Sequence, residues 1–128
     1  MSYYFSKTMK TDFDTAIEKV TAALKAEGFG ILTEIDIKAT LKKKLDVDFR
    51  PYKILGACNP PFAYKALQAE DKIGTMLPCN VIVQSIDGGT VEVSAVDPAA
   101  SMQAVENESL AEIAGEVRNK LKKIVESL

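Results

Sequence analysis

The sequence contains no histidine and no tryptophan. Histidine is the commonest general base and metal ligand at neutral pH, so its absence excludes Ser-His-Asp and Cys-His catalysis within one chain. Only cysteines and carboxylates remain as strong metal ligands. The two cysteines lack C-x-x-C spacing, so they provide neither a dithiol redox motif nor the four ligands of a structural zinc site. We therefore expect no metal and no cofactor.

A strong excess of one charge and long apolar runs are also missing. The formal net charge is −2, which gives no electrostatic reason to expect nucleic-acid binding. No apolar stretch approaches the length that spans a bilayer, and the first ten residues do not resemble a secretory signal. We expect no nucleic-acid partner, no membrane partner and a cytoplasmic location, where two cysteines remain thiols.

What the sequence does contain is typical of one globular domain over residues 1–128, with 47% hydrophobic and 27% charged residues. Apolar periodicity predicts five strands and four helices in the order β-α-β-α-β-α-β-β-α. The predicted strands cover residues 2–9, 29–35, 52–58, 79–86 and 90–96. The predicted helices cover residues 11–28, 37–45, 59–69 and 107–128. This order predicts a two-layer α/β (α+β) fold in which helices pack on a mixed five-stranded sheet.

Three segments carry more specific expectations. The apolar run at residues 52–58 predicts an inner strand covered on both faces. The lysine run at residues 42–44 is interpreted as a solvated helix face rather than a phosphate site. The apolar stripe of the last helix predicts packing on the sheet, and a partner helix from a second subunit along its edge is the alternative.

The stretch of residues 52–80 contains both cysteines and the most unusual junction. Cys58 ends a strand directly before a helix that Asn59 caps and Pro60 and Pro61 open. The positive end of a helix favours an anion, so a Cys58 thiolate with a lowered pKa is one hypothesis. The other is a small buried hydrophobic residue, which cysteine often is. A parallel sheet would hold Cys79 roughly 20 Å away, whereas antiparallel strands could bring the two thiols together.

Charged residues mark a second candidate position. Glu34 and Asp36 differ by two residues, so strand alternation places both on the same side, and Lys53 and Arg50 are near in sequence. Paired carboxylates can perform acid–base chemistry. More often such charges mark the solvent edge where a strand ends. Both interpretations stay open at this point.

Two long strings carry a family resemblance: GFGILTEIDIKATLKKKLDVDFRPYKILGACNPPFAYKALQAE at residues 28–70 and IGTMLPCNVIV at residues 73–83. The chain resembles the family called domain of unknown function 302. The resemblance implies a small two-layer α/β fold, often dimeric, in bacterial and archaeal proteins, with no established activity. It marks Glu34, Asp36, Lys53, residues 56–60 and residues 78–80 as site candidates without assigning them roles.

The leading interpretation is a non-enzymatic cytoplasmic binding or interaction module. We expect a homodimer, with a possible small-molecule ligand near the strand-to-helix junction at residues 56–61. The alternative is a thiol-dependent redox or sulfur-handling protein, in which Cys58 is the catalytic thiolate. The candidate binding residues are Glu34, Asp36, Lys53, Asn59, Pro60, Cys79 and Asn80.

Overall fold

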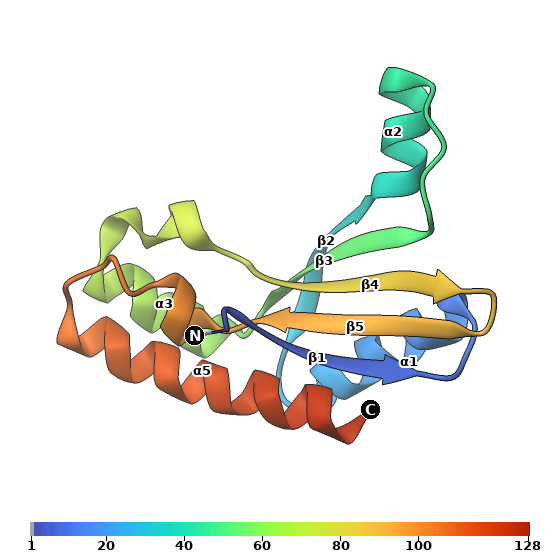
Figure 1. The fold of residues 1–128 in the computed structure, drawn as a ribbon. Coiled ribbons are helices and arrows are strands. Elements are labelled where there is room, and N and C mark those ends of the chain that lie inside the picture. The colour runs from blue at the N-terminus through green and yellow to red at the C-terminus, as the bar shows by residue number, and fades with distance from the viewer. Residues whose placement is uncertain (1) are drawn as a thin grey trace.

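A computed structural model describes residues 2–128 and contains five strands and six helical segments within them (Figure 1). The strands are β1 (Tyr4–Met9), β2 (Gly30–Asp36), β3 (Tyr52–Cys58), β4 (Cys79–Asp87) and β5 (Thr90–Val96). The helices are α1 (Phe13–Ala26), α2 (Ile37–Leu45), α3 (Pro60–Ala69), the 3-10 helix η1 (Asp71–Met76), α4 (Pro98–Ser101) and α5 (Glu108–Ser127). All nine predicted elements are therefore present, and η1 and α4 are short additions between them.

The five strands form one sheet in the order β1-β5-β4-β3-β2. The α+β class predicted from the sequence is confirmed, but each of the strand pairings is antiparallel, so the expectation of a mixed sheet was wrong. The reason lies in the connections. The long segment between β3 and β4 returns to the same end of the sheet instead of crossing over it, and only a crossover would make these neighbours parallel.

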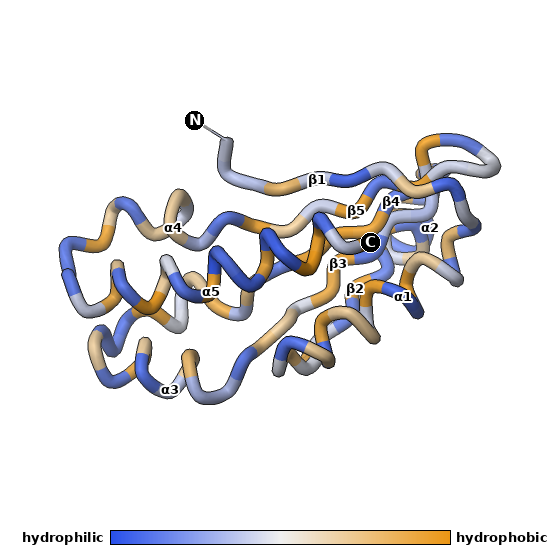
Figure 2. Tube along the Cα trace, turned by 90° about the horizontal axis from the view of Figure 1, so that it is seen from below, coloured by the Kyte–Doolittle hydropathy of each residue, from blue (hydrophilic) through white to orange (hydrophobic). Residues whose placement is uncertain are grey.

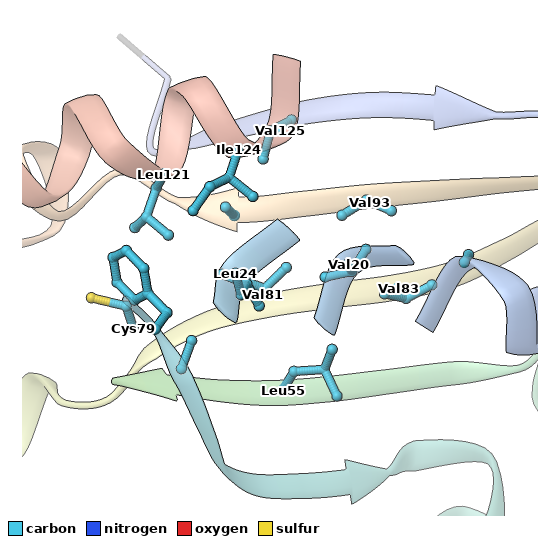
Figure 3. Close-up of a cluster of buried hydrophobic side chains, with 14 of the residues drawn as sticks. Val20, Leu24, Leu55, Cys79, Val81, Val83, Val93, Leu121, Ile124 and Val125 are labelled. Atoms are coloured by element: carbon cyan, nitrogen blue, oxygen red, sulfur yellow. The ribbon is translucent and has the colours of Figure 1, made fainter. Parts of the chain in front are cut away.

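One face of the sheet is covered by α1 and α5, which lie side by side against it (Figure 2). Strand alternation directs Val91, Val93 and Ala95 of β5 toward these helices, and all three are buried. Together with Leu24 of α1 and Leu121 of α5, these residues belong to the larger apolar cluster, called here the main core. Figure 3 shows part of it. The predicted packing of the last helix on the sheet is confirmed.

The opposite face of the sheet is open. Tyr4 and Ile35 on this face are 44% and 45% exposed, and Ile54 and Ile82 between them are half-buried. The strand β3 is thus an inner strand covered on one face only, and the prediction of cover on both faces was wrong. An antiparallel sheet can leave one face in water, whereas the continuous apolar run of β3 is more typical of a doubly covered parallel strand.

The helix ends follow local rules. Asn107 caps α5 by accepting a hydrogen bond from the Leu110 backbone N–H at 3.2 Å.

No residue of α2 is buried, and Lys42 pairs with Asp46 at 3.0 Å, so the solvated face predicted for the lysine run is confirmed. The helix α2 projects from one end of the sheet (Figure 1).

A second apolar cluster, called here the second core, lies where α3, η1 and α4 pack against the first half of α5. In Figure 1 these segments gather beyond the ends of β3 and β5, away from α1. The cluster contains Ala66, Ile73, Met102, Leu110 and Ala114. No helix within residues 2–128 combines the length and the apolar character needed to cross a bilayer.

Candidate functional site

A cavity of about 340 Å³ lies between the main core and the second core, where β3 ends and β4 begins. Ala57 and Cys79, which pair across the two strands, form one wall. Ala63 and Ala66 of α3 form another, and η1, α4 and α5 complete the lining. The cavity therefore lies at the strand-to-helix junction that the sequence marked.

The cavity exists because several of its lining residues are small. Besides the alanines of β3 and α3, it is lined by Ala114 of α5 and Gly74 of η1. A Cβ atom added at Gly74 would have Leu67 Cδ2 as its nearest neighbour at 4.0 Å, an ordinary contact distance. Gly74 is exposed, so the room beside it lies toward solvent. Ala57, Ala66 and Ala114 are buried, and the small volume of these side chains leaves space between the two cores.

The cavity reaches the surface beside two leucines. Leu32 and Leu67 both line it, yet they are 67% and 44% exposed. Leu32 lies in β2 at a shift of register between Ile31 and Thr33, which displaces its side chain from the regular alternation. These two exposed side chains lie where the cavity opens to solvent.

Both cysteines line the cavity as free thiols. The sequence left open whether Cys58 and Cys79 lie close together. The antiparallel pairing places Ala57 opposite Cys79 and so makes Cys58 a near neighbour of Cys79. In Figure 3 the Cys79 sulfur points away from Val83 and Val93, out of the end of the main core. Burial, with a smaller contribution from the nearby Cys58, raises the pKa of Cys79 to about 11.

The hypothesis of a thiolate at Cys58 is not supported. Burial raises the pKa of Cys58 instead of lowering it. The α3 helix begins with Pro60 and Pro61, and neither has a backbone N–H that could donate a hydrogen bond to a thiolate. The helix end that suggested an anion site therefore lacks two of its donors. Cys58 is a neutral thiol in an apolar wall at neutral pH.

Gly56 allows two neighbouring segments to approach the end of β3. A Cβ atom at this position would contact Thr33 Oγ1 of β2 and would come within 2.7 Å of Pro78 Cγ. Such approaches are possible only without a side chain. Pro78 in turn lines the cavity next to Cys79. Gly56 thus fixes the strand-side wall of the cavity.

Known proteins share this fold. A family model described as "Domain of unknown function DUF302" matches residues 5–128. The chain belongs to the DUF302 family. A solved structure of an uncharacterized conserved DUF302 protein from Bacillus stearothermophilus is 28% identical, with a TM-score of 0.90 over 98% of each chain. The search of curated proteins finds no significant match.

The residues marked by the resemblance to DUF302 fall into separate places. Cys58, Asn59 and Cys79 meet at the cavity. Asn59 is 9% exposed and begins α3 without a side-chain cap bond; its Nδ2 donates to the Glu27 carbonyl at 3.3 Å instead. Pro60 occupies the first turn of α3 at the surface. Asn59 therefore joins the start of α3 to the end of α1.

The charged candidates lie toward the other end of β3. Lys53 donates to Glu34 Oε1 at 2.9 Å, and this contact raises the pKa of Lys53. Asp36 caps α2 by accepting a hydrogen bond from the Ala39 backbone N–H at 2.9 Å. Five residues of strand separate Lys53 from Cys58, roughly 17 Å at 3.3 Å per residue. These side chains hold β2, β3 and α2 together and do not reach the cavity.

Asn80 is separated from the cavity in a different way. It is exposed and lines a depression on the open sheet face, whereas Cys79 faces the cavity.

Sequence reasoning missed most of the apolar lining, including Phe62, Leu77 and Ile113. These are apolar residues of ordinary type, and no motif in the sequence marks them. Within residues 2–128 no three acidic or thiol side chains form a group that could hold a metal ion.

Proposed function

We propose that this protein is a binding module that holds a small apolar molecule in the cavity at the end of β3 and β4. The observation that carries the proposal is the cavity itself. Its volume of about 340 Å³ lies within the range of roughly 300–1,000 Å³ that is typical of ligand sites. Its lining is almost wholly apolar, as in such sites generally.

The chemistry of the walls supports binding rather than catalysis. The nucleophilic side chains at the cavity are Cys58 and Cys79, and burial raises the pKa of both thiols. A thiol is a weak nucleophile until it is deprotonated. The thiol-dependent alternative would need a nearby base or cation, and among the described residues that line the cavity none is a Lys, Arg, Asp or Glu.

The proposal can be tested with N-phenyl-1-naphthylamine, a neutral probe whose fluorescence rises in apolar surroundings. The native protein should bind it saturably. The substitution Ala63→Leu adds three carbons to a cavity wall, and we expect it to weaken binding at least tenfold. Ala22→Leu makes the same change on the exposed side of α1, away from the cavity, and should leave binding unchanged. No fluorescence increase with the native protein, or equal binding by both variants, would refute the proposal.

The predicted homodimer remains a prediction. The open sheet face supports it, because Tyr4 and Ile35 expose apolar side chains there on either side of the half-buried Ile54 and Ile82. These apolar side chains share the face with polar ones, among them Gln84, Glu92 and Ser94.

A further inference from the structure

We infer that the cavity selects an uncharged apolar group, either a bicyclic aromatic ring system or an alkyl chain of similar volume, and rejects an ionised one. This inference rests on the proposed function, because it names the class of ligand for the same cavity. Three observations carry it: the walls have no charged side chain, the cavity has a volume of about 340 Å³, and α3 begins with two prolines.

The walls offer nothing that would pair with an ionic charge. Among residues 2–128, those that line the cavity include no acidic or basic side chain, and the two thiols remain protonated at neutral pH. Asn59 is the one side chain of the lining with an amide; this neutral group donates one of its two Nδ2 hydrogens to the Glu27 carbonyl and carries no charge. An ion moved from water into such a place loses its hydration without gaining a partner.

The start of α3 does not change this conclusion. A helix N-terminus commonly binds carboxylates and phosphates through its free backbone N–H groups. Here Pro60 and Pro61 occupy the first two positions and have no N–H, and the Ala63 N–H is bonded to the Asn59 carbonyl at 2.9 Å. An anion at the cavity would thus find few donors even at the helix end.

The volume indicates how large the enclosed group is. An apolar cavity of about 150 Å³ in a protein interior stays dry and accepts one benzene molecule. The present cavity, at about 340 Å³, has more than twice that volume. A group of two fused rings fills such a space better than a single ring does, and each unfilled part of an apolar wall forgoes dispersion contacts.

The test compares two ligands that share a ring system and differ in charge: methyl 2-naphthoate, which is neutral, and 2-naphthoate, which is ionised at pH 8. Each is titrated against the native protein carrying N-phenyl-1-naphthylamine. We expect the ester to displace the probe and the carboxylate to bind at least about 100-fold more weakly. A smaller difference would overturn the inference while leaving the proposed function intact. Failure of the probe itself to bind would instead refute the proposed function.

A charge placed on the wall provides a second measurement. Ala63→Lys adds an ammonium group at the cavity, and Ala63→Met adds a chain of comparable length without charge. We expect the preference for the ester to shrink at least tenfold in the lysine variant and to persist in the methionine variant. An unchanged preference in a folded lysine variant would show that wall charge does not control selection. If that variant does not fold, the comparison of the two ligands on the native protein decides.

Discussion

Replacing Gly56 with alanine should destabilise the whole domain through a single methyl group. Gly56 lies within β3, paired with Thr33 on one side and Asn80 on the other. The added Cβ would overlap Thr33 Oγ1 and would come within 2.7 Å of Pro78 Cγ. Real Cβ atoms are almost never found below 3.0 Å from a heavy atom, so both of these neighbours must move relative to Gly56. The proline ring is rigid, which leaves the backbone of β4 to shift.

Overpacking of this kind typically costs about 1–3 kcal/mol. Two neighbours are displaced here, so we expect the free energy of unfolding to fall by about 2–3 kcal/mol. That is a large part of the roughly 5–15 kcal/mol that stabilises a typical domain. For a chain of this length it corresponds to a decrease in Tm of roughly 6–12 °C. Pro78 also lines the cavity, so probe binding should weaken in the same variant.

Urea denaturation followed by circular dichroism measures this loss. Gly30→Ala is the matched control, because Gly30 also lies in a strand but a Cβ there meets nothing within 4 Å. The control should be neutral or slightly stabilising, by up to about 1 kcal/mol. Adding Thr33→Ala to the Gly56 variant should recover part of the loss. Equal stabilities of the Gly56 and Gly30 variants would refute the packing argument.

Two further predictions concern positions on either side of the cavity. Gly28→Ala should lower the free energy of unfolding, measured by urea denaturation, by about 1–2 kcal/mol. Gly28 has a φ of +86°, and a Cβ there would lie 3.2 Å from Asn59 Nδ2. An unchanged free energy of unfolding would contradict the left-handed backbone at Gly28. Folding raises the pKa of Cys79 from 9.0 to about 11, so between these pH values the folded state binds more protons than the unfolded state. The protein should therefore lose about 2–3 kcal/mol of stability as pH rises from 9 to 11. Cys79→Ala should lack this part of the loss, and equal pH slopes in the two proteins would contradict the burial of the thiol.

The elements of the fold were predictable from sequence because their signals are local. The apolar periodicity that predicted the strands and helices depends on a few neighbouring residues. The direction of the strands was not predictable in the same way. The segment between β3 and β4 is long enough either to cross the sheet or to return to the same end, and only tertiary packing decides between these paths.

The candidate site was predictable at its chemically distinctive residues and not at its walls. Cys58, Asn59 and Cys79 stood out by residue type, and all three line the cavity. The rest of the lining consists mainly of apolar residues, some buried and some exposed, from segments as distant in sequence as Phe29 and Val117. A cavity is defined by side-chain volume that is missing, and no short motif records this. The thiolate hypothesis is not supported, because burial raises the pKa of Cys58 and the two prolines that open α3 have no N–H to donate.

The place of the cavity follows from the path of the chain. The α3–η1 segment leaves the sheet at Cys58 and returns at Cys79, and its apolar residues divide between the two cores. Phe62 packs against the main core, whereas Ala66 and Ile73 lie in the second core with the first half of α5, whose second half covers the sheet. One helix therefore takes part in two cores, and Ile113 packs against both of them. The cavity lies between these two cores and is bounded by β3, β4, α3 and α5, so the proposed ligand would contact residues of both cores.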